Sequence, residues 1–200
     1  MTFLELARTR RSCRHYLPDP VPEDLRQQVL DAGRWAPSAL NSQPWEFIII
    51  TDPAVKQHLY DTASIAGFKW KHLLTAPMIV VVVARRLSPY SRDDCIFAAQ
   101  NMLLEATELG LGSCWLGGFS EARVKRLLSV PDSYLLPGMM TLGYPERVGP
   151  PPPRADLERQ IHRQTYQSRG LDLTHVSRIG RLAIKLLRLG HEKGEGKTDE

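Results

Sequence analysis

The chain has 200 residues, of which 42% are hydrophobic and 24% are charged, and its formal net charge is +4. This length and composition predict a soluble globular protein with enough chain to bury a hydrophobic core. The small positive charge is compatible with anionic small ligands. It argues against a nucleic-acid-binding protein, which would carry stronger basic clusters interleaved with aromatic residues.

The N-terminus and the cysteines predict a cytoplasmic protein. Met1–Leu6 lacks the basic leader and apolar core of a signal peptide, and the longest wholly apolar run, Met78–Ala84, is too short to span a bilayer. Cys13, Cys95 and Cys114 are odd in number, scattered and without a C-x-x-C pair. We therefore expect a reduced compartment and no structural zinc or iron–sulfur site.

The first predicted helix, Leu4–Arg10, leads into a cluster of hydrogen-bond donors. Arg10, Arg11 and Arg14 surround Ser12 within five residues. An arginine donates in a planar fork that matches a phosphate or a conjugated carbonyl, and a serine hydroxyl adds a short, adaptable donor. A solvated basic turn at a helix end is the alternative interpretation.

A second helix is predicted to begin at Pro22-Glu23-Asp24, because proline fits a first helical turn and acidic residues complement the helix dipole. Pro37 ends it. The following loop, Pro37–Trp45, is rich in amide and hydroxyl groups, and a strand is predicted at Glu46–Thr51. A loop held on a strand is a common place for binding groups, although an ordinary helix-to-strand connection has a similar composition.

The middle of the chain predicts buried elements. Helices are expected at Ala54–Ala63 and Phe68–Leu74, and the continuous apolar run Met78–Ala84 is typical of a strand covered on both faces. The longest predicted helix opens at Arg92 and runs to about Leu109, with Ser91 as its N-cap. Its apolar residues cover nearly the whole circumference, so we expect it to be buried in the fold or in a subunit interface.

Two more short strands are predicted, at Cys114–Leu116 and Met139–Gly143, with a helix capped by Ser120 between them. Gly117-Gly118 ends the first of these strands, at a point where backbone can approach a ligand closely. Cys114 could act as a nucleophile, but a free cysteine on a short strand is usually a small core residue.

The proline run at residues 150–153 is stiff and extended. It either carries Arg154 to a set place or forms an exposed linker. The glycines match neither a dinucleotide-binding fingerprint nor a P-loop, and no Ser-His-Asp or H-E-x-x-H signature is present. The sequence thus offers no standard nucleotide or hydrolase motif.

Taken together, these stretches resemble the nitroreductase family of flavin mononucleotide (FMN) enzymes. The match follows the family's order and spacing over residues 3–162. The matching segments are Arg10-Arg11-Ser12-x-Arg14, Trp35-Ala36-Pro37-Ser38-x-x-Asn41-x-Gln43-Pro44-Trp45, Ala99-Gln100-Asn101, Gly110-Leu111-Gly112-Ser113-Cys114-Trp115, Gly117-Gly118-Phe119 and Gly143-Tyr144-Pro145 before Arg154. The resemblance implies an α+β fold, with a mixed, mostly antiparallel sheet wrapped by helices. It also implies an intertwined homodimer with FMN at the subunit interface.

The resemblance further implies roles for individual residues. Those expected to bind FMN from its own subunit are Arg10, Arg11, Ser12 and Arg14 at the phosphate, ribityl chain and pyrimidine edge, Lys69 at the flavin edge, Leu116, Gly117 and Gly118 at the isoalloxazine, and Arg154 at the phosphate. Those expected from the second subunit are Pro37, Ser38, Ala39, Asn41 and Gln43. No metal site and no catalytic side chain is expected, because the flavin carries out the redox chemistry.

The implied activity is a ping-pong NAD(P)H oxidoreductase. NADH or NADPH would reduce the flavin and leave, and a nitroaromatic, a quinone or a similar electron-poor small molecule would then be reduced over the same ring. Arginine donors beside the flavin would stabilise its reduced anionic form. The alternatives are reductive dehalogenation, enone reduction or flavin fragmentation on the same fold, and a non-enzymatic protein that stores or senses flavin.

Two departures from the family leave the substrate class open. Some members carry glutamate where Gly117 stands, and this chain has no long helical excursion over the substrate. The implied organisation is an FMN-binding domain at residues 1–165 and a C-terminal extension at residues 166–200. Apolar and basic residues at 178–189 predict an amphipathic helix, followed by a charged, disordered end. We expect this helix to pack on the dimer partner, with an anionic membrane surface or another protein as alternatives.

Overall fold

The computed structural model of the chain describes residues 1–64, 69–170, 172–177, 180–181 and 184. The chain divides into two compact units, Met1–Gly149 and Pro150–Glu200. The division at residue 165, between a binding domain and an extension, stays a prediction. The amphipathic helix expected at residues 178–189 lies largely outside the described residues.

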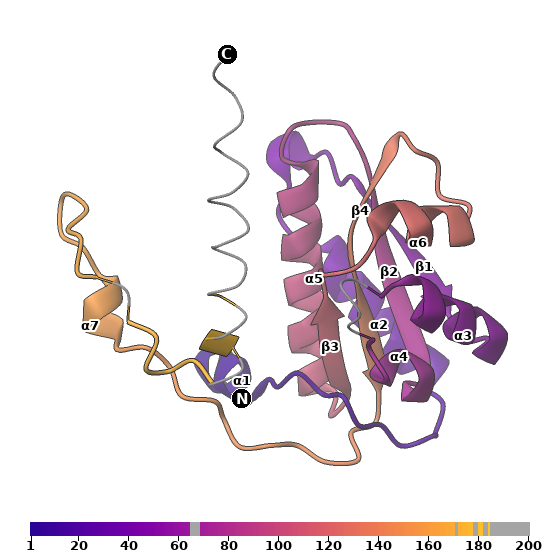
Figure 1. Cartoon of the computed structure of the whole chain (residues 1–200), viewed down its shortest axis with the longest axis horizontal. Coiled ribbons are helices and arrows are strands. Elements are labelled where there is room, and N and C mark those ends of the chain that lie inside the picture. The colour runs from indigo at the N-terminus through magenta and orange to yellow at the C-terminus, as the bar shows by residue number, and fades with distance from the viewer. Residues whose placement is uncertain (65–68, 171, 178–179, 182–183, 185–200) are drawn as a thin grey trace. The chain divides into compact units, whose positions relative to one another are not determined.

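A central sheet organises the first unit (Figure 1). In the described part of the chain it has four strands in the order β1-β2-β4-β3, all neighbours antiparallel. The strands are β1 (Trp45–Ile50), β2 (Met78–Arg85), β3 (Gly112–Leu116) and β4 (Tyr134–Gly143). Ser12 adds an isolated parallel bridge to Ser113 on the edge strand β3. The predicted α+β fold with a mostly antiparallel sheet is confirmed.

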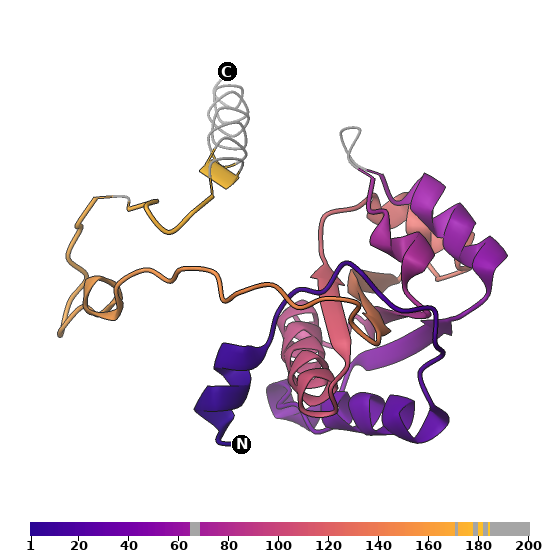
Figure 2. The ribbon, with the colours of Figure 1, turned by 90° about the horizontal axis from the view of Figure 1, so that it is seen from below.

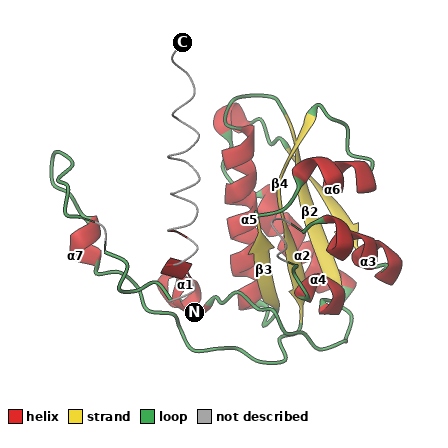
Figure 3. Cartoon of the chain, in the orientation of Figure 1, coloured by secondary structure: helices red, strands yellow, loops and turns green. Residues whose placement is uncertain are grey.

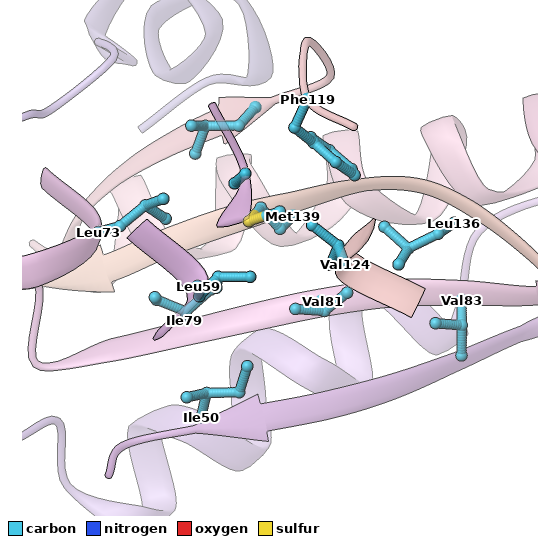
Figure 4. Close-up of a cluster of buried hydrophobic side chains, with 12 residues drawn as sticks. Ile50, Leu59, Leu73, Ile79, Val81, Val83, Phe119, Val124, Leu136 and Met139 are labelled. Atoms are coloured by element: carbon cyan, nitrogen blue, oxygen red, sulfur yellow. The ribbon is translucent and has the colours of Figure 1, made fainter. Parts of the chain in front are cut away.

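Helices cover both faces of the sheet (Figures 2 and 3). One face carries α2 (Glu23–Arg34) and α5 (Ser91–Glu108), and the other carries α3 (Pro53–Thr62), α4 (His72–Thr75) and α6 (Glu121–Leu127). Alternate residues of a strand point to opposite faces. In β2, Ile79, Val81 and Val83 therefore pack toward α3, α4 and α6 (Figure 4), whereas Met78 and Val80 pack toward α2 and α5. The continuous apolar run of β2 is thus buried on both faces, as predicted.

The remaining helices are short. Helix α1 (Phe3–Thr9) begins with a capping box in which the Thr2 hydroxyl accepts from the Glu5 amide and the Glu5 carboxylate accepts from the Thr2 amide. A 3₁₀ turn, η1, spans Ala39–Asn41, and α7 (Leu157–Gln160) belongs to the second unit. No described helix combines the length and the apolar content that a bilayer crossing requires.

Two predicted details are wrong. The helix expected at Phe68–Leu74 begins only at His72, so Lys69 precedes it. Ser91 is the first residue of α5 rather than its cap, because its hydroxyl accepts from the Ser88 amide at 3.1 Å instead of serving the helix.

Helix α5 is buried along one side only. Its buried face packs on the sheet and on α2 through Ala98, Met102 and Ala106. Ile96 and Phe97, in contrast, are 40% and 50% exposed in the single chain. The predicted burial of this helix is therefore confirmed for one side, and burial of the other side in a subunit interface stays a prediction.

We expect Gly138→Ala to lower the free energy of unfolding by about 1–3 kcal/mol, the usual cost of overpacking a core. A Cβ at Gly138 on β4 would overlap the indole ring of Trp115, which lies across it from β3. Urea denaturation would measure the change. The control Gly149→Ala, whose Cβ would meet no atom within 4 Å, should stay close to wild type. Equal stability of both variants would contradict the prediction.

Candidate functional site

The extended segment Arg10–Arg14 lies along the edge strand β3. The Cys13 amide donates to the Ser113 carbonyl at 2.8 Å, and Ser12 pairs with Ser113 in the parallel direction. The register therefore places Arg10 near the start of β3 and Arg14 toward its end. Their Cα atoms are about 13 Å apart, because an extended chain rises about 3.3 Å per residue. The segment distributes its donors along the whole strand.

Arg10, Ser12 and Arg14 gather around one buried thiol. Burial raises the pKa of the Cys114 thiol, and the opposing influences come from the charge of Arg14, a hydrogen bond with Ser12 and the charge of Arg10. All three are predicted cofactor-binding residues, and each influences the same buried thiol on β3. A buried thiol of raised pKa is a poor nucleophile, so the geometry gives no support to Cys114 as a catalytic group.

Arg11 points back to helix α1. Its Nη1 donates to the carbonyl oxygens of Arg8, Thr9 and Arg10 at 2.6, 3.0 and 2.8 Å. Carbonyls at a helix C-terminus lack partners inside the helix, and a basic side chain can satisfy them. Arg11 therefore fixes the junction between α1 and the extended segment.

A basic hollow of about 450 Å³ opens beside this segment. Arg11, Arg14, His15 and Arg147 line it, together with backbone of residues 110–112, and none of its described lining residues is acidic. The Arg147 guanidinium donates to Nε2 of His15 at 2.8 Å. Guanidinium groups without a carboxylate partner suit a phosphate. The charge of its lining therefore suits an anion.

Sequence reasoning missed His15 and Arg147. Each follows a segment that had been singled out, since His15 comes directly after Arg14 and Arg147 lies two residues after Gly143-Tyr144-Pro145. The available sequence signal for each residue was a charged side chain beside a recognised motif. The two residues are 132 positions apart in the chain, so their contact could be found only from the fold.

The far end of β3 leads to the exposed turn Gly117-Gly118, with Leu116 buried beneath it. The indole N–H of Trp70 donates to the Gly118 carbonyl at 3.2 Å. The rings of Trp70 and His72 meet edge to face, with centroids 6.3 Å apart. Trp70 therefore joins the segment before α4 to this turn.

His72 is buried beside these groups. Its side chain is 5% exposed, and its Nε2 has no hydrogen-bond partner among the described residues. Burial, assisted by the charges of Arg14 and His15, lowers the pKa of His72 to about 4. A neutral imidazole thus lies near Arg14 and His15. Neither His72 nor Trp70 was expected from the sequence to contribute to this site.

Lys69 is placed elsewhere. Its Nζ lies 3.2 Å from Oδ1 of Asp61 and 4.8 Å from the ring centroid of Tyr60, so it is engaged with α3. Its contact with a flavin stays a prediction. Arg154 is exposed and belongs to the second unit, and its phosphate contact also stays a prediction.

The predicted loop Pro37–Gln43 lies at the opposite end of α5. The Ala39 amide donates to Oδ1 of Asp94 in the first turn of this helix, whereas the basic hollow adjoins Thr107 in its last turn. Thirteen residues of helix separate Asp94 from Thr107, which is about 20 Å at 1.5 Å per residue. One chain therefore keeps the loop apart from its own arginines.

Comparison with known proteins identifies the family. The model of the nitroreductase family matches residues 7–69 and 53–144. The chain belongs to the nitroreductase family. An NADH dehydrogenase of Thermus thermophilus is 33% identical, with 76% of this chain and 91% of that protein aligned. An FMN-dependent nitroreductase from Clostridium difficile superimposes with a TM-score of 0.75 at 26% identity, covering 82% of this chain and 100% of that one.

Another relative of this nitroreductase-family chain is named for a different reaction. An iodotyrosine deiodinase of Thermotoga neapolitana is 28% identical, with 76% of this chain and 94% of that protein aligned. The predicted family and the predicted class of enzyme, a flavin- and nicotinamide-linked oxidoreductase, are confirmed. The family membership by itself does not select the electron acceptor.

We expect the stability to fall by about 2 kcal/mol between pH 6.5 and pH 5 through His72. The unfolded chain protonates this side chain with the ordinary pKa of 6.5, whereas the folded chain resists protonation down to about pH 4. The unfolded state therefore binds more protons in this window, and each pH unit costs about 1.4 kcal/mol. Urea denaturation at pH 7 and pH 5 would measure the loss.

His72→Gln should lose this part of the pH dependence. The control His58→Gln, at an exposed position of α3, should keep the wild-type slope. The same slope in His72→Gln and in wild type would contradict the assignment.

Proposed function

We propose that the protein is an FMN-dependent NAD(P)H oxidoreductase, active as a homodimer, which reduces nitroaromatics, quinones or similar electron-poor acceptors. The observation that carries the proposal is the donor strip, the segment Arg10–Arg14 that lies along β3. It runs from the basic hollow to an exposed glycine turn in a chain of the nitroreductase family.

The residues of this strip fit FMN in charge and in extent. Arg11 and Arg147 line the hollow at one end, where a phosphate dianion would be held by charge-assisted hydrogen bonds. Arg14 also lines the hollow, and it lies toward the end of β3 that leads to Gly117-Gly118, where exposed backbone would lie against a flat ring. The extended segment Arg10–Arg14, about 13 Å long, would suit a cofactor with a phosphate at one end and a ring at the other.

When bound, FMN would supply hydride transfer from NAD(P)H to the acceptor. The contribution of the chain is binding and electrostatics. The Arg14 guanidinium would place a permanent positive charge where negative charge develops on reduction, and such preorganised donors stabilise the charged state. The neighbouring neutral His72 adds polarity without a second charge. No described side chain is required as a nucleophile, in keeping with the burial of Cys114.

A homodimer would complete the site. Two α5 helices packed antiparallel about a twofold axis would place the first turn of each beside the last turn of the other. The loop Pro37–Gln43 of one chain, held at Asp94, would then reach the arginines of its partner. The exposed Ile96 and Phe97 on α5 supply an apolar surface for such pairing. Cytoplasmic location and any membrane contact of the tail stay predictions.

Reductive dehalogenation is the second candidate reaction. It is favoured by the deiodinase relative from Thermotoga neapolitana, whose aligned region includes most of that protein. Some family members carry glutamate where this chain has Gly117. An acidic side chain that could discriminate between electron acceptors would therefore be absent from the flavin edge of this chain. Both reactions would use the same donor strip.

We expect Arg14→Ala to weaken FMN binding by about 10- to 100-fold, because a hydrogen bond to a charged group contributes roughly 1.5–3 kcal/mol. Titration followed by flavin fluorescence would measure the dissociation constant. Arg8→Ala is the matched control, since Arg8 is exposed at the end of α1 and lies outside the basic hollow. Equal affinity in both variants would remove Arg14 from the site.

Steady-state turnover tests the proposed reaction. We expect the purified protein to be yellow and to oxidise NADH or NADPH with a quinone or a nitroaromatic acceptor. Parallel double-reciprocal plots would indicate a ping-pong cycle. Iodotyrosine, added under reducing conditions, tests the second candidate through iodide release. A flavin-loaded protein that turned over none of these acceptors would overturn the proposed reaction.

A further inference from the structure

The loop Pro37–Gln43 has a strained backbone. Leu40, Asn41 and Gln43 have φ angles of 55°, 53° and 45°, in the left-handed region that residues other than glycine rarely adopt. The Leu40 side chain is fully exposed, so its burial in the single chain does not offset the strain. Such a conformation persists only where surrounding contacts hold it.

The contacts inside the loop are exposed. The Ser38 hydroxyl accepts from the Gln43 amide at 3.0 Å, and the Gln43 side chain donates to Oδ1 of Asn41 at 3.1 Å. In the described part of the chain, the hydrogen bond that leaves the loop runs from the Ala39 amide to Oδ1 of Asp94, at 3.2 Å. Because it is partly buried whereas the bonds inside the loop are exposed, this bond is the stronger constraint.

Asp94 is a carboxylate in a place where one is costly. It is 3% exposed, and its Oδ2 is buried without a partner among the described residues. Burying a carboxylate is unfavourable unless it is hydrogen-bonded or paired. Its position in the first turn of α5 offsets part of this cost, since a helix N-terminus favours negative charge. An apolar residue would fill the same space, so packing alone does not account for the carboxylate.

We propose that Asp94 is a positioning residue of the cofactor site, which holds the Ala39 amide and thereby the loop Pro37–Gln43 in the form that reaches the flavin of the second subunit. This inference rests on the proposed function. Asp94 also borders a hollow of about 430 Å³ together with Pro37, Ser38 and Phe97. In the proposed homodimer the second subunit would cover this hollow.

Hydrogen–deuterium exchange of the full chain tests the contact directly, with or without FMN. Asp94→Ala should speed exchange of the Ala39 amide by about tenfold or more, because local opening then lacks its main restraint. Exchange in β2 and β4 should stay unchanged. Asp94→Asn keeps an acceptor oxygen and should restore most of the protection. Asp93→Asn, which removes the neighbouring exposed charge in the same turn, is the matched control.

A second variant keeps the test decisive if Asp94→Ala does not fold. Ala39→Pro deletes the donor instead of the acceptor, and the preceding Ser38 is already extended (φ −143°, ψ 152°), as a residue before proline must be. It should reproduce the loss of loop protection. Unchanged exchange of loop peptides in either folded variant would overturn the proposal.

Mixed dimers test whether the loop acts across the subunit boundary. Co-expression with two affinity tags would give dimers of one Asp94→Ala subunit and one Arg14→Ala subunit. If the loop serves the second subunit, both lesions fall in one site and the other site is intact, so half of the wild-type FMN occupancy is expected. If Asp94 served its own subunit, both sites would be damaged and occupancy would be lost.

The two proposals fail in different ways. A wild-type chain that binds no FMN would overturn the proposed function, while the exchange of the Ala39 amide would still report whether Asp94 holds the loop. A wild-type chain that binds FMN, with loop exchange and occupancy unaffected by Asp94→Ala, would overturn only the role of Asp94. Global unfolding would instead raise exchange in β2 and β4 as well, which separates a positioning role from a purely structural one.

Discussion

The hydrogen bond from the Cys13 amide to the Ser113 carbonyl, 2.8 Å long, is the contact on which the candidate site depends. An edge strand leaves one row of backbone groups unpaired, and β3 uses this row to hold the segment that carries the arginines. The approach is close, because a Cβ at Gly112 would come within 2.8 Å of the Cys13 side chain. The parallel register then decides which arginine lies near the start of β3 and which lies toward the glycine turn.

Helix α5 gives the site its second constraint. Its buried face belongs to the hydrophobic core, while its two ends hold the two halves of the site about 20 Å apart, as the rise of an α-helix requires. A rigid helix of this length cannot bring the loop and the arginines of one chain together. The same distance becomes an advantage when two copies pack antiparallel, because each end then meets the complementary end of the partner. The architecture of one chain thus favours a symmetric pair.

Buried polar groups mark where this fold leaves interactions open. Glu121 shows the satisfied case, since it accepts from the Leu136 amide and pairs with Arg92 and Lys125. Burial opposes its ionisation, but these contacts lower its pKa overall. Asp94 and His72 are more deeply buried, and each keeps an atom without a partner among the described residues. Such atoms are costly in a finished structure, and both lie where a second chain or a cofactor is proposed.

The sequence by itself determined the elements and the family. Periodicity and capping are local properties, so strand β2, helices α2 and α5 and the donor cluster at Arg10–Arg14 could be predicted within a few residues. The tertiary structure alone decided which side chains meet: Arg147 with His15, Trp70 with the glycine turn, Lys69 with Asp61. These meetings depend on strand order and register, which join residues far apart in the chain and leave no local pattern. The separation of the loop from the arginines has the same origin, because only the packed position of α5 sets the distance between them.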